Sequence, residues 1–281
     1  MPPPSYVQPT ILADALAALA QAPLVPLAGG TDFYPARVGC PVSEGVLDLS
    51  RIAGLRGIER AGDTWRLGAL TTWSDLRRQP VPGFLRALRQ AAGEVGGVQV
   101  QNAGTIGGNL CNASPGADGV PPLLALSAQV ELARVHGVRT LPLAQFILGN
   151  RRTARAPDEL LTAILLPGFG ARTRTAFRKL GARRYLVISI VMVAARVDID
   201  ASGRIMDAAV AVGACSEVAQ RLPALERRLI GRLLAPDLSD LPQASDLAIL
   251  TPRSDVRGSA EYRLDAGLSL VRRTLGDLFH E

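Results

Sequence analysis

The sequence predicts an α+β protein built from two parts that join near residue 170. In the first part, short apolar segments alternate with segments of helical periodicity, which is typical of strands alternating with helices. In the second part, two apolar strands flank a tight turn at residues 201–203, which predicts an antiparallel meander. Apolar residues make up 48% and charged residues 20% of the 281 residues, so the chain can bury a core.

The expected elements of the first part follow from caps, turns and breakers. Thr10 is placed to cap a first helix, and Asp14 lies in its first turn. Thr72 and Asp75 form a capping box for a later helix, which ends before Pro80. The sequence predicts helices at 11–21, 73–79, 84–92 and 121–127, strands at 24–27, 46–49 and 129–134, and a hairpin of 58–60 with 65–67.

The expected boundary between the two parts is marked by Pro167-Gly168-Phe169-Gly170. Beyond it the sequence predicts strands at 187–199 and 205–212 and helices at 222–234 and 261–278.

Charge and apolar patterning exclude several classes of function. The net charge of +6 comes from arginines that are scattered among acidic residues, and aromatic residues are 4% of the chain, so a nucleic-acid surface is not favoured. The longest apolar stretch, residues 186–195, is too short for a membrane helix, which needs about 20 residues. The N-terminus lacks the pattern of a signal peptide, so we expect a cytoplasmic protein.

Few residues are available for metal binding or acid–base catalysis. Cys40, Cys111 and Cys215 are far apart, and the chain has only two histidines. We therefore expect no metal site and no catalytic side chain in this chain.

Two glycine-rich segments are candidates for a phosphate site. Gly29-Gly30-Thr31-Asp32 follows a predicted strand, and Thr105-Ile106-Gly107-Gly108-Asn109 lies in an uncharged segment that is dense in Gly, Asn, Ser and Thr. Adjacent glycines let backbone amides converge on an anion, although each segment alone is also compatible with an ordinary turn. The second segment matches neither a Rossmann fingerprint nor a P-loop. Together, the two segments favour a ligand with two phosphates, such as a dinucleotide.

Asp118 is a third candidate, because a carboxylate accepts hydrogen bonds from ribose hydroxyls. The alternative is that Asp118-Gly119 forms a simple turn.

These motifs, in this order and spacing, resemble those of the FAD-binding medium subunit of molybdenum hydroxylases, the xanthine dehydrogenase and carbon monoxide dehydrogenase family. The resemblance includes Ala113-Ser114-Pro115 before Asp118, and two C-terminal motifs at residues 213–221 and 255–263. It covers nearly the whole chain. It implies an α+β, two-subdomain FAD-binding fold of the PCMH type, with subdomains at 1–57 and 58–170. A C-terminal domain at 171–281, with a three-stranded antiparallel sheet and helices, is expected to follow.

The resemblance also implies which residues bind FAD. The first glycine segment would hold the diphosphate together with Thr105, Gly108 and Asn109, and Asp118 would bind an FAD hydroxyl. Lys179 would lie beside the isoalloxazine or its chain, and Tyr185 would either stack on the flavin or pack at the start of a strand. The expected FAD-binding residues are Leu27, Ala28, Gly29, Gly30, Thr31, Asp32, Phe33, Thr105, Ile106, Gly107, Gly108, Asn109, Asp118, Leu161, Lys179 and Tyr185.

Two positions depart from the pattern of the family. Gln101 stands where many members carry Arg, and Tyr185-Leu186 stands where many carry an acidic residue. The first departure suggests a different contact at the second glycine segment, and the second bears on the electron acceptor.

The implied function is electron transfer through FAD. The expected partners are a large subunit with the molybdenum cofactor, a small subunit with 2Fe–2S clusters that relays electrons to FAD, and NAD⁺ or another electron acceptor. One alternative is a self-sufficient flavin oxidase of the related fold, which the scarcity of His and Tyr disfavours. Another is a binding or assembly subunit that has lost FAD, which the intact glycine segments disfavour.

Overall fold

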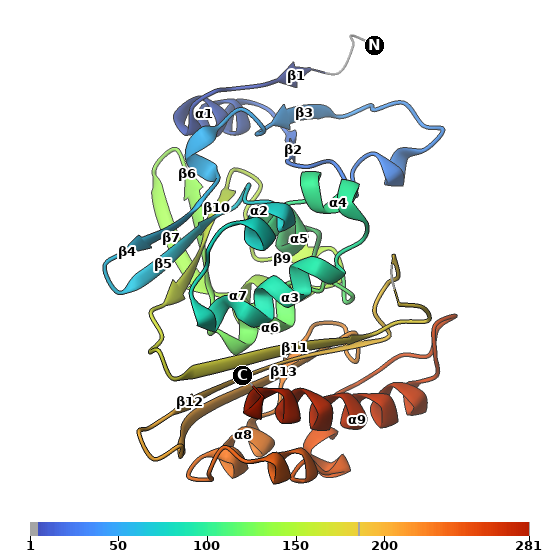
Figure 1. Cartoon of the computed structure of the whole chain (residues 1–281). Coiled ribbons are helices and arrows are strands. Elements are labelled where there is room, and N and C mark those ends of the chain that lie inside the picture. The colour runs from blue at the N-terminus through green and yellow to red at the C-terminus, as the bar shows by residue number, and fades with distance from the viewer. Residues whose placement is uncertain (1–4, 185, 281) are drawn as a thin grey trace.

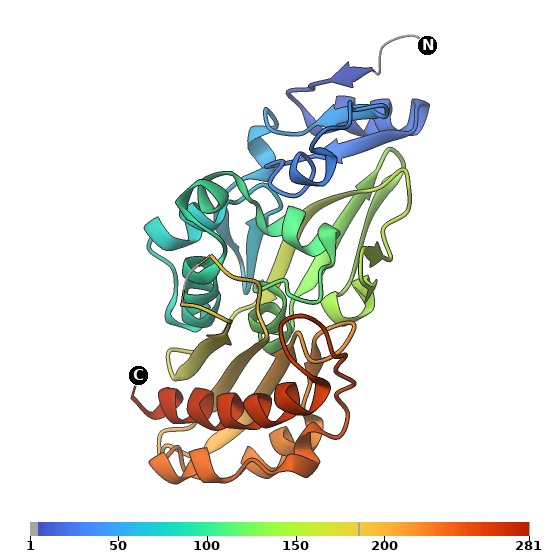
Figure 2. The same cartoon turned by 90° about the vertical axis from the view of Figure 1, so that its right-hand side faces the viewer.

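The protein is stacked in three parts along its long axis, in the order of the sequence. The computed structural model describes residues 5–184 and 186–280. In Figures 1 and 2 the blue N-terminal part lies at one end, a cyan-to-green part in the middle, and a gold-to-red C-terminal part at the other end. Each part combines a sheet with helices, which confirms the α+β class.

The N-terminal part is a parallel sheet in the order β1–β3–β2, with helix α1 beside it. Helix α1 buries Ala15, Leu16 and Leu19. The predicted cap at Thr10 is wrong, because the backbone is still extended at Ile11, which is the residue that precedes the helix and makes no side-chain cap. The elements are β1 (Tyr6–Val7), α1 (Leu12–Gln21), β2 (Leu24–Leu27), the 3₁₀ helix η1 (Pro35–Arg37), β3 (Gly45–Asp48) and the 3₁₀ helix η2 (Ala53–Leu55).

The middle part is built on an antiparallel sheet in the order β4–β5–β10–β6–β7. The predicted hairpin is confirmed as β4 (Ile58–Ala61) and β5 (Thr64–Gly68), and the other strands are β6 (Gln129–Arg134), β7 (Gly137–Pro142) and β10 (Leu160–Pro167). A small hairpin of β8 (Ile147–Gly149) and β9 (Arg152–Thr153) lies beside them.

Short helices cover one side of this middle sheet. The predicted capping box is confirmed at the start of α2, where the amide of Asp75 donates to Thr72 Oγ1 and the amide of Thr72 donates to the Asp75 carboxylate. The helices are α2 (Trp73–Arg78), η3 (Gly83–Leu85), α3 (Arg86–Glu94), α4 (Val98–Ala103), α5 (Ile106–Asn112), α6 (Val120–Ala125) and α7 (Leu143–Phe146).

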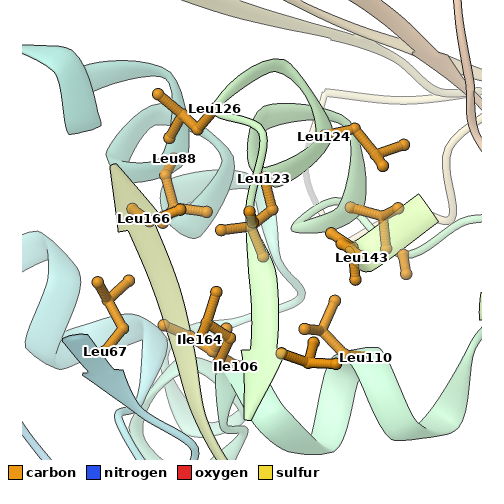
Figure 3. Close-up of a cluster of buried hydrophobic side chains, with 14 of the residues drawn as sticks. Leu67, Leu88, Ile106, Leu110, Leu123, Leu124, Leu126, Leu143, Ile164 and Leu166 are labelled. Atoms are coloured by element: carbon orange, nitrogen blue, oxygen red, sulfur yellow. The ribbon is translucent and has the colours of Figure 1, made fainter. Parts of the chain in front are cut away.

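The core of the middle part fixes the position of α5. Ile106 and Leu110 on α5 are fully buried, together with Leu123 on α6 and Ile164 on β10. Figure 3 shows these side chains meeting between the helices and the sheet. Each fully buried aliphatic side chain stabilises the fold by roughly 1.5–3 kcal/mol. The second glycine segment is therefore anchored by apolar packing on the side of α5 that faces the core.

The C-terminal part is an antiparallel sheet in the order β11–β12–β13–β14. It has four strands where three were expected, because the two-residue strand β14 adds to the edge of β13. The elements are β11 (Thr173–Leu180), β12 (Val191–Ile199), β13 (Ile205–Gly213), β14 (Gln220–Arg221), α8 (Pro223–Leu229), the 3₁₀ helices η4 (Pro236–Asp240) and η5 (Ala244–Leu247), and α9 (Ala260–Phe279).

Two predicted boundaries in this part are wrong. The strand expected from residue 187 begins at Val191, because Leu186 has a positive φ of 54° and the chain there makes a loop. The helix expected to reach residue 234 ends at Leu229, because Ile230 is extended and Gly231 has a φ of +83°. The meander of β12 and β13 is confirmed.

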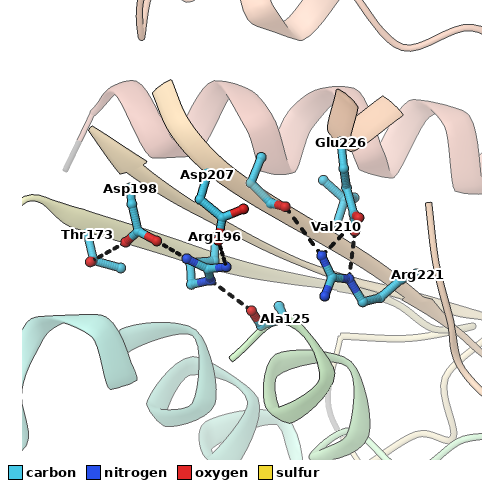
Figure 4. Close-up of polar contacts among 9 residues, drawn as sticks. Ala125, Thr173, Arg196, Asp198, Asp207, Val210, Arg221 and Glu226 are labelled. Carbon is cyan, nitrogen blue, oxygen red and sulfur yellow. Dashed lines mark hydrogen bonds and ion pairs between the residues drawn. The ribbon is translucent and has the colours of Figure 1, made fainter. Parts of the chain in front are cut away.

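Helices cover both faces of the C-terminal sheet. Helix α9 packs on one face, and α3 and α6 of the middle part pack on the other (Figure 1). Buried Arg196 on β12 crosses this contact: its Nε donates to the carbonyl of Ala125 at 2.9 Å, and its other nitrogens pair with Asp198 and Asp207 (Figure 4). The middle and C-terminal parts are thus joined by apolar and charged contacts. None of the helices formed by the described residues is long and apolar enough to span a membrane.

Candidate functional site

A cavity of about 460 Å³ lies between the N-terminal and middle parts, at the carboxyl end of β2. Its walls are the loop that follows β2, helix α5, and the segment around β9 and the start of β10. The expected site residues that line it are Leu27, Ala28, Gly29, Gly30, Thr31, Asp32, Phe33, Thr105, Gly107, Gly108, Asn109 and Leu161.

The loop after β2 presents a row of backbone amides. Gly30 has a φ of +69°, in the left-handed region that glycine adopts without strain. Among the residues that the structure describes, no hydrogen-bond acceptor is paired with the amides of residues 29–33. Unpartnered amides that follow one another in such a turn form a concave site for an anion.

Glycine at position 29 is required by a close approach between the two parts. A Cβ on Gly29 would lie 1.7 Å from the carbonyl oxygen of Ala103, at the end of α4. This approach brings the loop of residues 28–33 against the start of α5. The two glycine segments therefore meet, as the sequence predicted.

The amides at the start of α5 are used differently. All four amides of residues 106–109 donate hydrogen bonds within the protein, at 2.9–3.0 Å, to Thr71 O, Ala69 O, Thr105 Oγ1 and Thr105 O respectively. The second glycine segment therefore offers the cavity no unpaired amide at these positions. Its glycines serve close packing: a Cβ on Gly107 would lie 2.7 Å from the carbonyl oxygen of Ala69.

Asn109 lines the cavity and carries an unpaired polar atom. Its Oδ1 is buried and has no hydrogen-bond partner among the described residues, and the residue lines the cavity. A buried acceptor without a partner costs about 1–3 kcal/mol, so such an atom indicates a missing donor. A ligand hydroxyl or amine at this point would supply that donor.

Asp118 and Lys179 form a buried ion pair behind the cavity rather than in its lining. Lys179 Nζ lies 2.6 Å from Asp118 Oδ2 and 3.1 Å from the carbonyl oxygen of Glu94, and Ser189 Oγ donates to Asp118 Oδ1 at 2.5 Å. Burial raises the pKa of the Asp118 carboxyl, and the ammonium of Lys179 opposes this effect. The pair joins the segment before α6 to β11, and therefore the middle part to the C-terminal part.

Two expected residues remain, Ile106 and Tyr185. Ile106 is fully buried in the core of the middle part. Tyr185 lies outside the described residues. Its neighbour Leu186 is exposed, and a Cβ on Gly97 would lie 2.8 Å from its side chain, so the loop after β11 passes close to the start of α4.

Three arginines that the sequence analysis did not single out also line the cavity: Arg37, Arg151 and Arg155. Arg151, in the turn between β8 and β9, pairs with Asp32 at 3.0 Å across 119 positions of the sequence. No local pattern marks these three among the many scattered arginines of the chain, because their proximity arises only from the fold.

Cys111 is the cysteine that lines the cavity. Burial raises the pKa of its thiol to about 11, and the positive charge of Arg155 opposes this effect. At neutral pH the group is a protonated thiol, which is a poor nucleophile. Cys111 is therefore not expected to act as a nucleophile in this cavity.

The two halves of the chain match two family models. Residues 3–169 match the FAD binding domain in molybdopterin dehydrogenase. Residues 175–278 match the carbon monoxide dehydrogenase flavoprotein C-terminal domain. The chain belongs to this family.

Individual relatives agree over nearly the full length. The chain is 30% identical to the carbon monoxide dehydrogenase medium chain of Hydrogenophaga pseudoflava, over 96% of this chain and 95% of that one. It is also 30% identical to the xanthine dehydrogenase FAD-binding subunit of Escherichia coli O157:H7, over 97% and 95%. A solved carbon monoxide dehydrogenase from Hydrogenophaga pseudoflava superposes with a TM-score of 0.90 at 31% identity, over 99% of this chain and 98% of that chain.

The resemblance that the motifs predicted is therefore confirmed. The protein is an FAD-binding subunit of the xanthine dehydrogenase and carbon monoxide dehydrogenase type of oxidoreductase, and its cofactor is FAD. The described residues fit this cofactor, because the unpaired amides suit a diphosphate and Asn109 Oδ1 suits a hydroxyl. The cavity volume also lies within the range of about 300–1,000 Å³ that is usual for cofactor sites.

Proposed function

We propose that this flavoprotein holds FAD inside a molybdenum hydroxylase complex and passes electrons from the 2Fe–2S clusters of a small partner subunit to NAD⁺ or another acceptor. A large partner subunit with the molybdenum cofactor would oxidise the organic substrate. The names of the relatives support an assembly, because they include medium chains and subunits of dehydrogenase complexes. The observation that carries the proposal is the unpaired amide row of residues 29–33 in a cavity of a family that binds FAD.

The loop after β2 would hold the diphosphate of FAD. Amides of residues 29–33 would donate to the phosphate oxygens, and the Thr31 hydroxyl would add a donor. Asn109 Oδ1 would accept a hydrogen bond from an FAD hydroxyl, which would satisfy its buried oxygen. Leu161, which is buried in the cavity wall, would give an apolar contact.

Asp118 and Lys179, which lie outside the cavity lining, would stabilise the structure around this site. Their ion pair and the bond from Ser189 keep the polar groups at the junction of the middle and C-terminal parts satisfied. Gly119, next to Asp118, packs against Asn109, since a Cβ there would lie 2.9 Å from Asn109 Oδ1. We propose that bound FAD lies near the Asp118–Lys179 pair, on the side where Gly119 contacts Asn109.

The protein itself would bind FAD, orient it and set the charge of its surroundings. FAD supplies both one-electron and two-electron redox chemistry when bound, which suits an exchange between single-electron clusters and a two-electron acceptor. The cavity residues bring no thiolate, and neither histidine lines the cavity. No side chain of this chain is assigned a proton transfer to the organic substrate.

A spectroscopic experiment tests this proposal. The purified chain should show flavin absorbance, and acid precipitation should release the colour, because no residue attaches FAD covalently in the proposal. In the complex isolated from the source cell, native mass spectrometry should show two further chains, and substrate should bleach the flavin.

The isolated chain serves as the control, because substrate should leave its flavin oxidised. Reduction by substrate without any partner chain would contradict the proposal and favour the self-sufficient oxidase. A chain that binds no FAD would favour an assembly subunit.

A further inference from the structure

The three arginines that line the cavity differ in how their charges are compensated. Arg37 Nε donates to the Glu44 carboxylate at 2.8 Å, and Arg151 pairs with Asp32 at 3.0 Å. Arg155 has no carboxylate within ion-pair distance among the residues that the structure describes. It is therefore the cavity-lining arginine whose charge the described residues leave uncompensated.

Arg155 is nevertheless held in a fixed orientation. Its Nη1 donates to three backbone carbonyls, at 3.1, 3.4 and 2.7 Å, which belong to Ala156, Pro157 and Glu159. Its Nε and Nη2 make no hydrogen bond with any described residue, and the side chain is only half-buried. Because a guanidinium is planar, fixing one nitrogen fixes the direction of the other donors.

Arg155 lies near Leu161 in the cavity wall and is not part of the glycine loop. Thr31 of that loop meets the start of α5, since a Cβ on Gly104 would lie 3.4 Å from Thr31 Oγ1. Arg155 Nη1 instead donates to the carbonyl of Glu159 at 2.7 Å, two positions before Leu161 on β10.

We propose that Arg155 raises the reduction potential of bound FAD by placing an uncompensated positive charge beside the flavin ring. This inference rests on the proposed binding of FAD, with its diphosphate at the glycine loop. The ring would then lie toward Leu161 and Arg155, because Leu161 is buried in the same wall. A flavin ring that takes two electrons and one proton gains one negative charge. A nearby cation stabilises that charge, and more strongly in a partly desolvated cavity than in water.

The test is the reduction potential of FAD in the purified protein, measured by dye equilibration for wild type, Arg155→Gln and Arg155→Lys. Arg155→Gln should lower the equilibrium constant for two-electron reduction about tenfold, which is about 30 mV. Arg155→Lys should keep most of the wild-type potential, because lysine keeps the charge. Arg152→Gln is the matched control: Arg152 is three residues away along the chain, is exposed and does not line the cavity, so the potential should not change.

The pH dependence of the reduction potential separates an effect of the Arg155 charge from a structural effect. The difference between wild type and Arg155→Gln should shrink at acidic pH, where the reduced ring takes a second proton and loses its charge. Equal potentials in wild type and Arg155→Gln, with FAD bound to both, overturn this inference and leave the proposed function standing. A lower potential in both Arg155→Gln and Arg155→Lys also overturns it, because that result indicates a structural role. A wild-type chain without FAD overturns the proposed function itself.

Discussion

The two glycine segments that meet at the cavity have similar compositions, but their backbone amides differ in hydrogen bonding. In the loop of residues 29–33 the amides have no partner among the described residues, and Gly30 has a positive φ. In the segment of residues 105–109 the amides from 106 onward are all bonded within the protein. One segment therefore has donors to give to a ligand, and the other has already used them.

This difference shows that glycine has two separate uses in one site. In the first segment Gly30 permits a left-handed turn beside the exposed amides, and Gly29 lets this loop approach Ala103 closely. In the second, glycine removes side chains so that α5 can approach the end of β5, with Gly107 against Ala69. Substitutions should therefore affect FAD binding mainly in the first segment and folding stability mainly in the second.

The largest expected effect is loss of FAD from Gly29→Ala. The added Cβ would lie 1.7 Å from the backbone oxygen of Ala103, so the loop must move and its amides lose their alignment. A hydrogen bond to a charged group contributes about 1.5–3 kcal/mol, so losing one or two should raise the Kd for FAD about 100-fold. Fluorescence titration of the apoprotein measures the Kd, and circular dichroism checks the fold.

Gly54→Ala is the matched control, because no atom lies within 4 Å of its Cβ position. Tight FAD binding by Gly29→Ala would show that the loop does not hold the diphosphate.

Gly107→Ala should act on stability instead. Its Cβ would meet backbone and side-chain atoms of Ala69 at 2.7 Å, and overpacking of this kind costs about 1–3 kcal/mol. Urea denaturation of the apoprotein should show this loss, while FAD that remains bound to the folded protein keeps a Kd within about tenfold of wild type. Gly93→Ala on α3 is the control, since its nearest neighbour, a nitrogen of Arg77, is 3.9 Å away. Unchanged stability with weakened FAD binding would reverse the roles given to the two segments.

Much of the fold follows from local signals that the structure confirms. The strand at 24–27, the β4–β5 hairpin and the Thr72 capping box are each decided by adjacent residues. The failures are at positions where distant contacts decide, such as the start of β12 and the end of α8. The boundaries at residues 57 and 170 stay a prediction.

The sequence predicted many of the residues that form the candidate site, but not their arrangement. The sequence indicated that both glycine segments meet at one ligand, and it could not tell which amides would be unpaired. That depends on Ala69 and Thr71, which accept bonds from α5 only because β5 ends beside it. The pairing of Asp118 with Lys179 and the convergence of three arginines likewise depend on long-range packing.

A smaller effect is expected from Gly30→Ala. A non-glycine residue at a φ of +69° costs about 1 kcal/mol, and the Cβ would lie 2.7 Å from the ring of Tyr34. FAD affinity should therefore fall about fivefold. The double variant Gly30→Ala/Tyr34→Ala removes the contact with the ring and keeps the backbone strain. If the double variant regains wild-type affinity, the contact with Tyr34 and not the left-handed turn explains the glycine.

The smallest expected effect is that of Thr105→Ala, which tests the boundary between the two segments. Thr105 Oγ1 accepts the Gly108 amide at 3.0 Å and so caps α5, and losing such a cap costs about 1 kcal/mol. The Kd for FAD should change less than about threefold, because the oxygen of Thr105 serves to cap α5 and the unpaired amides belong to the other segment. Thr105→Ser is the matched control, since serine keeps the capping oxygen and should restore the stability. If Thr105→Ala weakens FAD binding more than about tenfold at unchanged stability, the hydroxyl contacts the cofactor directly, and the second segment then donates to the ligand like the first.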